Sequence, residues 1–249
     1  MQSTLEVSSV PLAKINESNL PDGFASGCLM DYYGRRLLLT VAHAAREGPS
    51  LALALGWDTS LRRVKLWKLG GLNFLARGQL DRGATTLDQM ELKDVDFAYV
   101  DVPPDLEPRL EKIDPHTGTI IEFRACTVWD ASAIAEPDPG SRYGFAGHTK
   151  PSVEDHALIA SDVKFCFTEL RLCFPLSFVG ADDDLLLFRL PIEHPGHDFF
   201  RGCSGAPIID EHGHVVALVC HGNLETSTIY GLSLRRYQVA LDIHTGHFG

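Results

Sequence analysis

No long apolar segment occurs in this sequence. The longest apolar runs are short, such as Leu185–Phe188, whereas a helix that crosses a membrane needs about 20 apolar residues. The N-terminal segment mixes short apolar patches with Glu6, Lys14 and Glu17, and it has no basic region followed by an apolar one. We therefore expect no secretory signal, and a soluble, cytoplasmic protein.

Basic side chains are fewer than acidic ones. The chain has 22 Lys and Arg against 33 Asp and Glu, for a formal net charge of −11. A chain with this charge repels the phosphate groups of nucleic acids and of anionic lipids. We therefore expect neither a nucleic acid nor a membrane among its partners.

Paired cysteine motifs are missing too. The six cysteines form no Cys-x-x-Cys pair, which argues against a zinc ribbon and against a thioredoxin-like redox motif. We expect reduced, buried thiols, no metal and no cofactor. The histidines outside the motifs below lack ligands at metal-binding spacing and are interpreted as solvated loop residues; they are His116, His148, His156, His194, His197, His212, His214, His244 and His247.

Short strands separated by turn residues dominate what is present. With 249 residues, 45% of them apolar, the chain can form one large domain or two small ones. Hairpins are predicted at Asp31–Arg35, where Gly34 is available for the turn, at Gly70-Gly71 and at Glu211–Gly213. This pattern is typical of an all-β barrel or sandwich. Helical spacing follows near the C-terminus, at Leu234, Tyr237, Val239 and Leu241.

Two segments in the N-terminal half pair a histidine with a candidate partner. His43 follows an apolar strand in "LLLTVAHAA", and its small neighbours would let the imidazole project into a cleft. Asp96 precedes Phe97-Ala98 in "DVDFAYVDV", where it could accept the Nδ1 hydrogen of a histidine. Taken alone, each is equally explained as an ordinary core or surface residue.

The segment around Ser204, "RGCSGAPII", is the most informative. Gly202 permits a backbone conformation that turns successive amides toward one point. The amides of Gly202 and Ser204 would then bind an oxyanion while the Ser204 hydroxyl attacks. The alternative for this segment alone is a glycine-rich turn before a hairpin.

Together and in this order, "TVAHA", "DFA" and "GCSGAP" resemble the histidine, aspartate and serine motifs of the trypsin-like (chymotrypsin-fold) serine peptidases. The resemblance implies an all-β chain of two six-stranded antiparallel β-barrels with a short C-terminal helix. Residues 1–115 would form the first barrel and carry His43 and Asp96. Residues 116–249 would form the second barrel and carry Ser204 and the S1 pocket, with the active site in the cleft between them.

The resemblance also implies the activity, a serine endopeptidase that acts on proteins or peptides through an acyl-enzyme. Ser204 would attack the peptide carbonyl, His43 would carry the proton, and Asp96 would orient His43. The oxyanion would lie against the amides of Gly202 and Ser204. Asp94 is the rival for the triad acid; Asp96 is preferred because it directly precedes the apolar–Ala pair.

Several positions depart from the secreted members of this family. Ala44 stands where they have a cysteine after the catalytic histidine, and Cys203 stands where zymogens have an aspartate before the serine. The first residues show no Ile-Val-Gly-Gly-like start. We expect an intracellular or bacterial-type member without zymogen activation, which implies a narrow substrate or an activating or inhibiting protein partner. Cys203 is an alternative nucleophile, but the family places the nucleophile directly before glycine, at Ser204.

Specificity is assigned by position in the same family. Asp198 would lie at the base of the S1 pocket and favour Arg or Lys at P1, unless it is a solvated loop acid. Cys220, His221 and Gly222 would form the pocket wall. His221 suggests a third possibility, a pocket for acidic P1 residues, because a histidine can pair with a carboxylate.

Two other functions compete with the peptidase. One is a catalytically silent protein of this fold that acts as a protein-binding module, with Cys203 distorting the oxyanion loop. The other is an esterase with a Gly-x-Ser-x-Gly elbow, but Gly-Cys-Ser-Gly-Ala lacks the second elbow glycine and the strand–turn–helix context.

Overall fold

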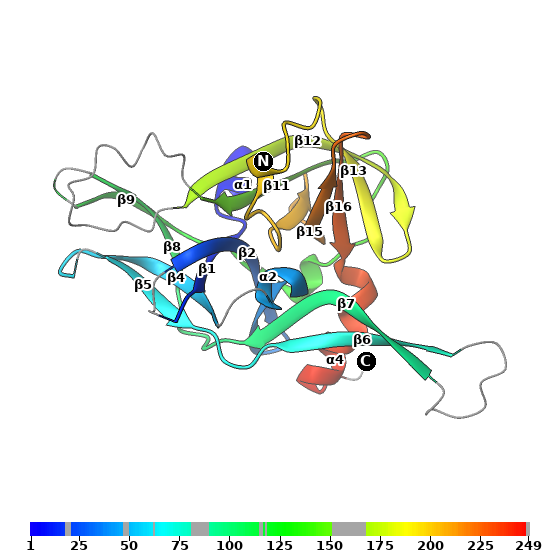
Figure 1. Ribbon diagram of the computed structural model, residues 1–249, viewed down its shortest axis with the longest axis horizontal. Helices are drawn as coiled ribbons and strands as arrows, with labels where there is room; N and C mark the ends of the chain where they lie inside the picture. Colours follow the sequence, from blue (N-terminus) through cyan, green and yellow to red (C-terminus); the bar gives the residue numbers. More distant parts are fainter. Residues whose placement is uncertain are drawn as a thin grey trace.

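Antiparallel strands make up most of the structure, a computed structural model (Figure 1). It describes residues 1–17, 21–46, 50–61, 63–80, 90–114, 117, 119–150 and 168–247. The strands form one large sheet in the N-terminal half and a closed barrel in the C-terminal half, which confirms the all-β prediction. None of the helices in the described ranges is long and apolar enough to pass through a bilayer.

The N-terminal sheet has eight strands. Hydrogen bonds order seven of them β5-β4-β1-β2-β3-β7-β6, and β10 joins β2 in parallel. Their bounds are β1 Val10–Ile15, β2 Pro21–Tyr32, β3 Arg35–Thr40, β4 Ser50–Asp58, β5 Arg63–Lys68, β6 Asn73–Leu80, β7 Met90–Asp101 and β10 Val128–Asp130. This half differs from the expected six-stranded barrel, because within the described residues its ladder ends at β5 and β6 without closing.

The predicted hairpin at Gly70-Gly71 is wrong, whereas the one at Gly34 is confirmed. β5 pairs with β4 and β6 pairs with β7, so the two glycines cross between opposite ends of the sheet. A hairpin and a crossover both need a flexible connection, so the local pattern cannot separate them. Gly34 closes the turn between β2 and β3 with a φ of 84°, as a tight hairpin requires.

Six strands close the C-terminal barrel, as predicted, in the order β11-β12-β13-β16-β15-β14. Tyr143, Phe145 and Phe188 are large buried side chains of its core. The predicted turn at Gly213 joins β14 to β15. The strand bounds are β11 Arg142–Thr149, β12 Glu169–Asp182, β13 Leu185–Arg189, β14 Pro207–Asp210, β15 Val215–Asn223 and β16 Thr228–Ser233.

Helices and one hairpin complete the described chain. Their bounds are α1 Gln2–Glu6, α2 Ala42–Arg46, η2 Ala131–Ala133, η3 Asp198–Phe200, α4 Leu234–Thr245, β8 Arg109–Ile113 and β9 Ile120–Ala125. β8 pairs with β9, and residues 115 and 116, between which the domain boundary is predicted, lie outside the described residues. That boundary stays a prediction.

The predicted C-terminal helix, α4, packs beside the N-terminal sheet (Figure 1). Leu234, Tyr237 and Leu241 are buried on one face of it, while Val239 is exposed. The Tyr237 ring stacks on Phe97 of β7 with 5.3 Å between ring centroids. The helix therefore follows the barrel in the chain but shares its apolar face with the other half.

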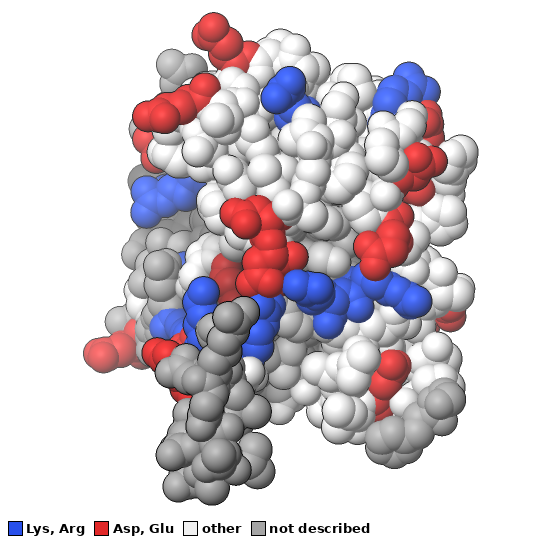
Figure 2. Space-filling model, turned by 90° about the vertical axis from the view of Figure 1, so that its right-hand side faces the viewer, with Lys and Arg blue, Asp and Glu red and all other residues white. Residues whose placement is uncertain are grey.

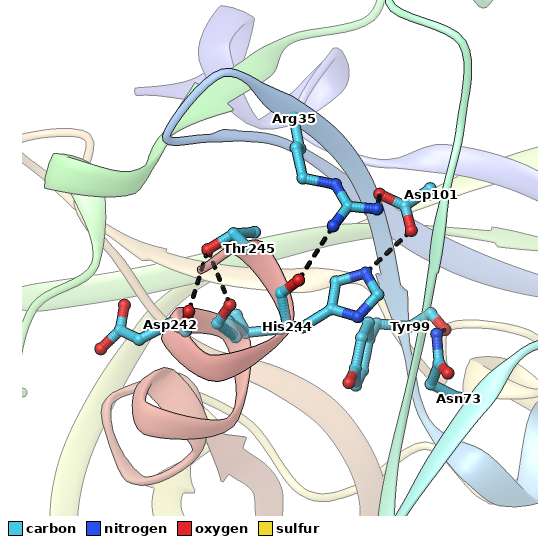
Figure 3. Close-up of polar contacts among 8 residues, drawn as sticks. Arg35, Asn73, Tyr99, Asp101, Asp242, His244 and Thr245 are labelled. Carbon is cyan, nitrogen blue, oxygen red and sulfur yellow. Dashed lines mark hydrogen bonds and ion pairs between the residues drawn. The ribbon is translucent and has the colours of Figure 1, made fainter. Parts of the chain in front are cut away.

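Polar contacts hold the end of α4 against β3 and β7 (Figure 3). Oδ2 of Asp101 lies 2.8 Å from Nε2 of His244, and Oδ1 of Asp101 lies 2.7 Å from Arg35. Arg35 also donates to the backbone carbonyl of His244 at 2.9 Å. Elsewhere, Arg77 of β6 lies 2.6 Å from Asp183, in the turn between β12 and β13. Figure 2 shows that basic and acidic side chains lie next to one another across one face of the molecule. These pairs fix the N-terminal sheet relative to the C-terminal half.

Candidate active site

His43 comes from α2, the short helix that follows β3. Ala42 and Ala44 are buried, so the helix packs through its alanines and leaves the imidazole partly exposed. The Nδ1 atom of His43 lies 2.7 Å from Oδ2 of Asp96, and the backbone N–H of His43 donates to Oδ1 at 2.7 Å. Both carboxylate oxygens thus contact the same residue, which fixes the direction of the imidazole.

Asp96 and Asp94 lie on the same strand but have different partners. Asp96 lies on β7, which is hydrogen-bonded to β3, and this pairing brings the aspartate beside the start of α2. Asp94 instead lies 2.6 Å from Arg46, with its side chain 68% exposed. The structure therefore brings Asp96, and not its rival, to His43.

The carboxylate of Asp96 has a second side-chain donor. Burial raises the pKa of Asp96, but hydrogen bonds from His43 and Cys220 outweigh burial and hold that pKa below its usual value. Sγ of Cys220 lies 3.0 Å from Oδ2 of Asp96. Burial and the nearby carboxylate raise the pKa of the thiol, so it keeps its proton and donates.

His43, Asp96 and Cys220 also offer ligand atoms within 4.8 Å of one another. They are the one set of this kind that could hold a metal ion among the described residues.

Ser204 lies in a tight turn between η3 and β14. Gly202 and Gly205 on either side have φ of 107° and 91°, a conformation that glycine adopts without a steric penalty. The Ser204 hydroxyl donates to the Cys220 carbonyl at 3.3 Å, and no hydrogen bond between described residues joins it to His43. Ser204 and His43 line one cavity of about 370 Å³.

The N-terminal sheet holds the serine loop through Ser26. The amide of Ser26 donates to the Ser204 carbonyl at 3.0 Å, and its hydroxyl donates to the Gly202 carbonyl at 2.9 Å. Thr40 in turn donates to the Ser26 carbonyl at 2.9 Å. Sequence analysis missed Ser26 and Thr40, because a small polar residue in a strand gives no local sign of a contact with a distant loop.

The amides of Gly202 and Ser204 are the predicted oxyanion donors. No backbone oxygen in the described part of the chain accepts a hydrogen bond from either of them. A Cβ on Gly202 would lie 2.4 Å from the His148 carbonyl oxygen, so only glycine fits there. Their role as oxyanion donors stays a prediction.

Comparison with known proteins identifies the fold in which this site lies. No family model matches the sequence, and no curated protein matches it. Solved structures match nearly the whole chain. Human heparin binding protein has a TM-score of 0.53 at 11% identity, covering 96% of this chain and 92% of that one. Product-complexed tobacco etch virus protease has a TM-score of 0.52 at 10% identity, covering 99% and 81%.

A Glu endopeptidase has a TM-score of 0.51 at 12% identity, covering 98% of this chain and 93% of that one. The chain has the chymotrypsin fold. A serine endoprotease from Yersinia pestis also matches, and the chain spans 64% of its length. At these identities the likeness shows the fold, so the chemistry must be argued from the site.

The predicted S1 residues of this chymotrypsin-fold chain all line the cavity beside Ser204; they are Asp198, Cys220, His221 and Gly222. Asp198, however, begins η3 and is exposed, so it is not a buried carboxylate at the pocket base. The His221 ring stacks on Tyr230, with 4.5 Å between ring centroids. Cys220, His221 and Gly222 thus lie around the cavity together with an exposed Asp198, and their assignment to an S1 pocket stays a prediction.

His194 occupies part of this region, and its interpretation as a solvated loop residue is wrong. Its ring lies edge-on to Phe200, with 5.3 Å between centroids. Its Nε2 lies 2.4 Å from the point that a Cβ on Gly222 would occupy. The HxxH spacing with His197 was the one signal that could have drawn attention to it, but that spacing says nothing about how the loop folds.

Two other histidines, His148 and His244, differ from the same interpretation. His148 is fully buried, Nδ1 lies 3.0 Å from the Thr168 hydroxyl, and burial lowers its pKa to about 4. His244 lies in α4 and contacts the Asp101 carboxylate described above. His214, in contrast, is exposed in the turn between β14 and β15, as expected, and lies 2.9 Å from Asp210. His116 and His156 lie outside the described residues.

Cys203, the alternative nucleophile, is completely buried. Burial raises the pKa of its thiol to about 12, so the reactive thiolate is scarce at neutral pH. A Cβ on Gly147 would lie 2.6 Å from Cβ of Cys203, which shows how tightly the cysteine is packed. The structure therefore gives Cys203 a place in the barrel core.

Proposed function

We propose that this chain is a serine endopeptidase in which Ser204 is the nucleophile, His43 the general base and Asp96 the residue that orients His43. The observation that carries the proposal is that Asp96 makes two hydrogen bonds with His43, and that His43 and Ser204 line the same cavity. Solved proteases share the fold, which supports the same conclusion. Proteins or peptides are the proposed substrates.

The reaction would proceed in two halves. Ser204 Oγ leaves the Cys220 carbonyl and attacks the peptide carbonyl carbon while Nε2 of His43 takes its proton. His43 then passes that proton to the leaving amine, and the acyl-enzyme forms. A water molecule, deprotonated by His43, attacks the acyl carbon and releases the second product and the free Ser204.

Two features of the site would lower the barrier. Asp96 holds the Nδ1 hydrogen of His43 and stabilises the imidazolium that forms during each half. The amides of Gly202 and Ser204 would donate to the oxyanion, and each such donor is typically worth about 3 kcal/mol. A preference for Arg or Lys at P1 would rest on Asp198, a single exposed carboxylate.

Digestion of a mixed peptide library tests the proposal. We expect new termini by mass spectrometry with the wild-type protein and none with Ser204→Ala. This variant should keep the fold, because among the described residues the hydroxyl makes a single hydrogen bond, to the Cys220 carbonyl. Cys203→Ser serves as the control for the other candidate nucleophile and should still cleave. Equal cleavage by wild type and Ser204→Ala would refute the proposal.

A catalytically silent binding module is the second candidate. The contact between the Ser204 hydroxyl and the Cys220 carbonyl favours it, because it directs the hydroxyl away from His43. Human heparin binding protein shows that a protein named for binding has this fold, although a net charge of −11 opposes a polyanionic ligand here. Absence of cleavage, together with retained folding, would favour this candidate.

A further inference from the structure

The loop between β13 and η3 inserts His194 into the cavity beside Ser204. The loop is attached at Ser227, whose carbonyl accepts from the Leu190 amide at 2.9 Å and whose hydroxyl accepts from the His194 amide at 3.1 Å. The Gly196 amide then donates to Nδ1 of His194 at 3.1 Å. Backbone and ring are therefore both held in one position.

These contacts determine where the ring carries its proton. Nδ1 of His194 accepts a hydrogen bond, so the neutral ring has its hydrogen on Nε2. Burial, and then the proximity of His197, lower the pKa of His194, which favours the neutral form at neutral pH. Nε2 is buried and has no hydrogen-bond partner among the described residues. A buried donor without an acceptor costs free energy, which a suitable acceptor would recover.

The surroundings of Nε2 favour an anionic acceptor. The residues that line the cavity include His194, His197 and His221 in addition to His43, and also Arg201. Asp198 is the one carboxylate among the described lining residues, and it is exposed at the start of η3. Donors and cationic groups thus outnumber acceptors around a cavity that also contains Ser204.

We propose that this cavity takes an acidic P1 side chain, glutamate or aspartate, and that His194 is the residue that selects it. Nε2–H of His194 would donate to the P1 carboxylate, with Arg201 close enough to the cavity to add positive charge. The ring now packs against Gly222, so Nε2 would meet the carboxylate after the ring turns away from Gly222. The inference rests on the proposed function, because P1 is defined by cleavage at Ser204.

Peptides that differ only at P1 test the assignment. We compare kcat/KM for Glu, Asp, Gln, Arg and Phe at P1 with wild type, His194→Ala, His194→Gln and Asp198→Asn. Wild type should prefer Glu over Gln about tenfold, because a hydrogen bond to a charged carboxylate is stronger than one to the neutral side-chain carbonyl of Gln. His194→Ala should lose that preference, and His194→Gln should keep part of it through its amide N–H. Asp198→Asn should keep or increase the preference, because it removes the one carboxylate among the described lining residues.

Two readouts separate failure of this proposal from failure of the proposed function. The rate of fluorophosphonate labelling at Ser204 should be equal in wild type and His194→Ala, because that reagent has no P1 side chain. Binding of the P1 Glu and P1 Gln peptides to Ser204→Ala measures the preference without catalysis. An Arg preference that Asp198→Asn abolishes, or a Glu preference that survives in His194→Ala, would overturn the role of His194, as would equal binding of the two peptides.

Discussion

Cys220 donates its thiol hydrogen to Asp96, at 3.0 Å from Sγ to Oδ2, and Nδ1 of His43 contacts that same oxygen at 2.7 Å. One carboxylate oxygen therefore receives two donors, and the other receives the His43 amide. The arrangement keeps Asp96 ionised and aimed at the imidazole. The thiol of Cys220 therefore helps to hold the Asp96 carboxylate of the proposed triad in place.

The first prediction concerns this thiol. Cys220→Ala removes one donor from Asp96 and should lower kcat/KM about tenfold, because a hydrogen bond to a charged group contributes about 1.5–3 kcal/mol. Cys220→Ser replaces the thiol by a hydroxyl donor and should stay near wild type. The pH profiles of both variants check this, since loss of the donor raises the pKa of Asp96. Wild-type kinetics in Cys220→Ala would contradict the supporting role.

The second prediction separates the two aspartates of β7. Asp96→Asn should lower kcat by about 10⁴-fold, the loss typical when an amide replaces the acid of a triad. Asp94→Asn is the matched control, because its exposed ion pair with Arg46 contributes little, and activity should change less than about threefold. Steady-state kinetics on one peptide substrate decide it, and the reverse order of effects would assign the triad acid to Asp94.

The third prediction compares two glycines with the same φ of 91°, Gly205 and Gly213. A Cβ on Gly205 would lie 2.1 Å from the backbone oxygen of Ser26, whereas a Cβ on Gly213 meets nothing within 4 Å. Gly213→Ala should cost only the left-handed backbone penalty, about 1–2 kcal/mol. Gly205→Ala should lose more stability and also activity. Urea unfolding measures both, and equal losses would contradict the packing of the serine loop on Ser26.

The fourth prediction concerns pH and stability. The unfolded chain protonates His148 near pH 6.5, whereas the folded chain does so near pH 4 because the imidazole is buried. Between these values the unfolded state holds more protons, so stability falls as the pH drops from 6.5 toward 4, by up to about 3 kcal/mol. In His148→Gln this contribution should vanish. Unfolding curves at several pH values test it, and identical pH slopes for the two proteins would exclude His148 as the cause.

His43, Asp96 and Ser204 could be predicted from three short segments taken together and in order, because each segment alone is also explained by an ordinary residue. Small alanines expose the imidazole, and glycines at positive φ shape the serine turn. The closed C-terminal barrel is implied by the family resemblance, since strands and turns alone leave both a barrel and a sandwich open.

Features that depend on contacts between distant segments could not be predicted. The position of His194 follows from how its loop folds back on Ser227, and the roles of Ser26 and Thr40 follow from packing of the N-terminal sheet against the serine loop. The open ladder of the N-terminal sheet depends on pairing choices at Gly70-Gly71 that short-range patterns do not contain.

The central claim is that Ser204 is an activated nucleophile, and intact-protein mass spectrometry after a fluorophosphonate probe tests it most directly. The account predicts one adduct on wild type and one on Cys203→Ala, and none on Ser204→Ala. It also predicts slower labelling of His43→Ala, which lacks the general base. An adduct that persists in Ser204→Ala, or no adduct on folded wild-type protein, would contradict it.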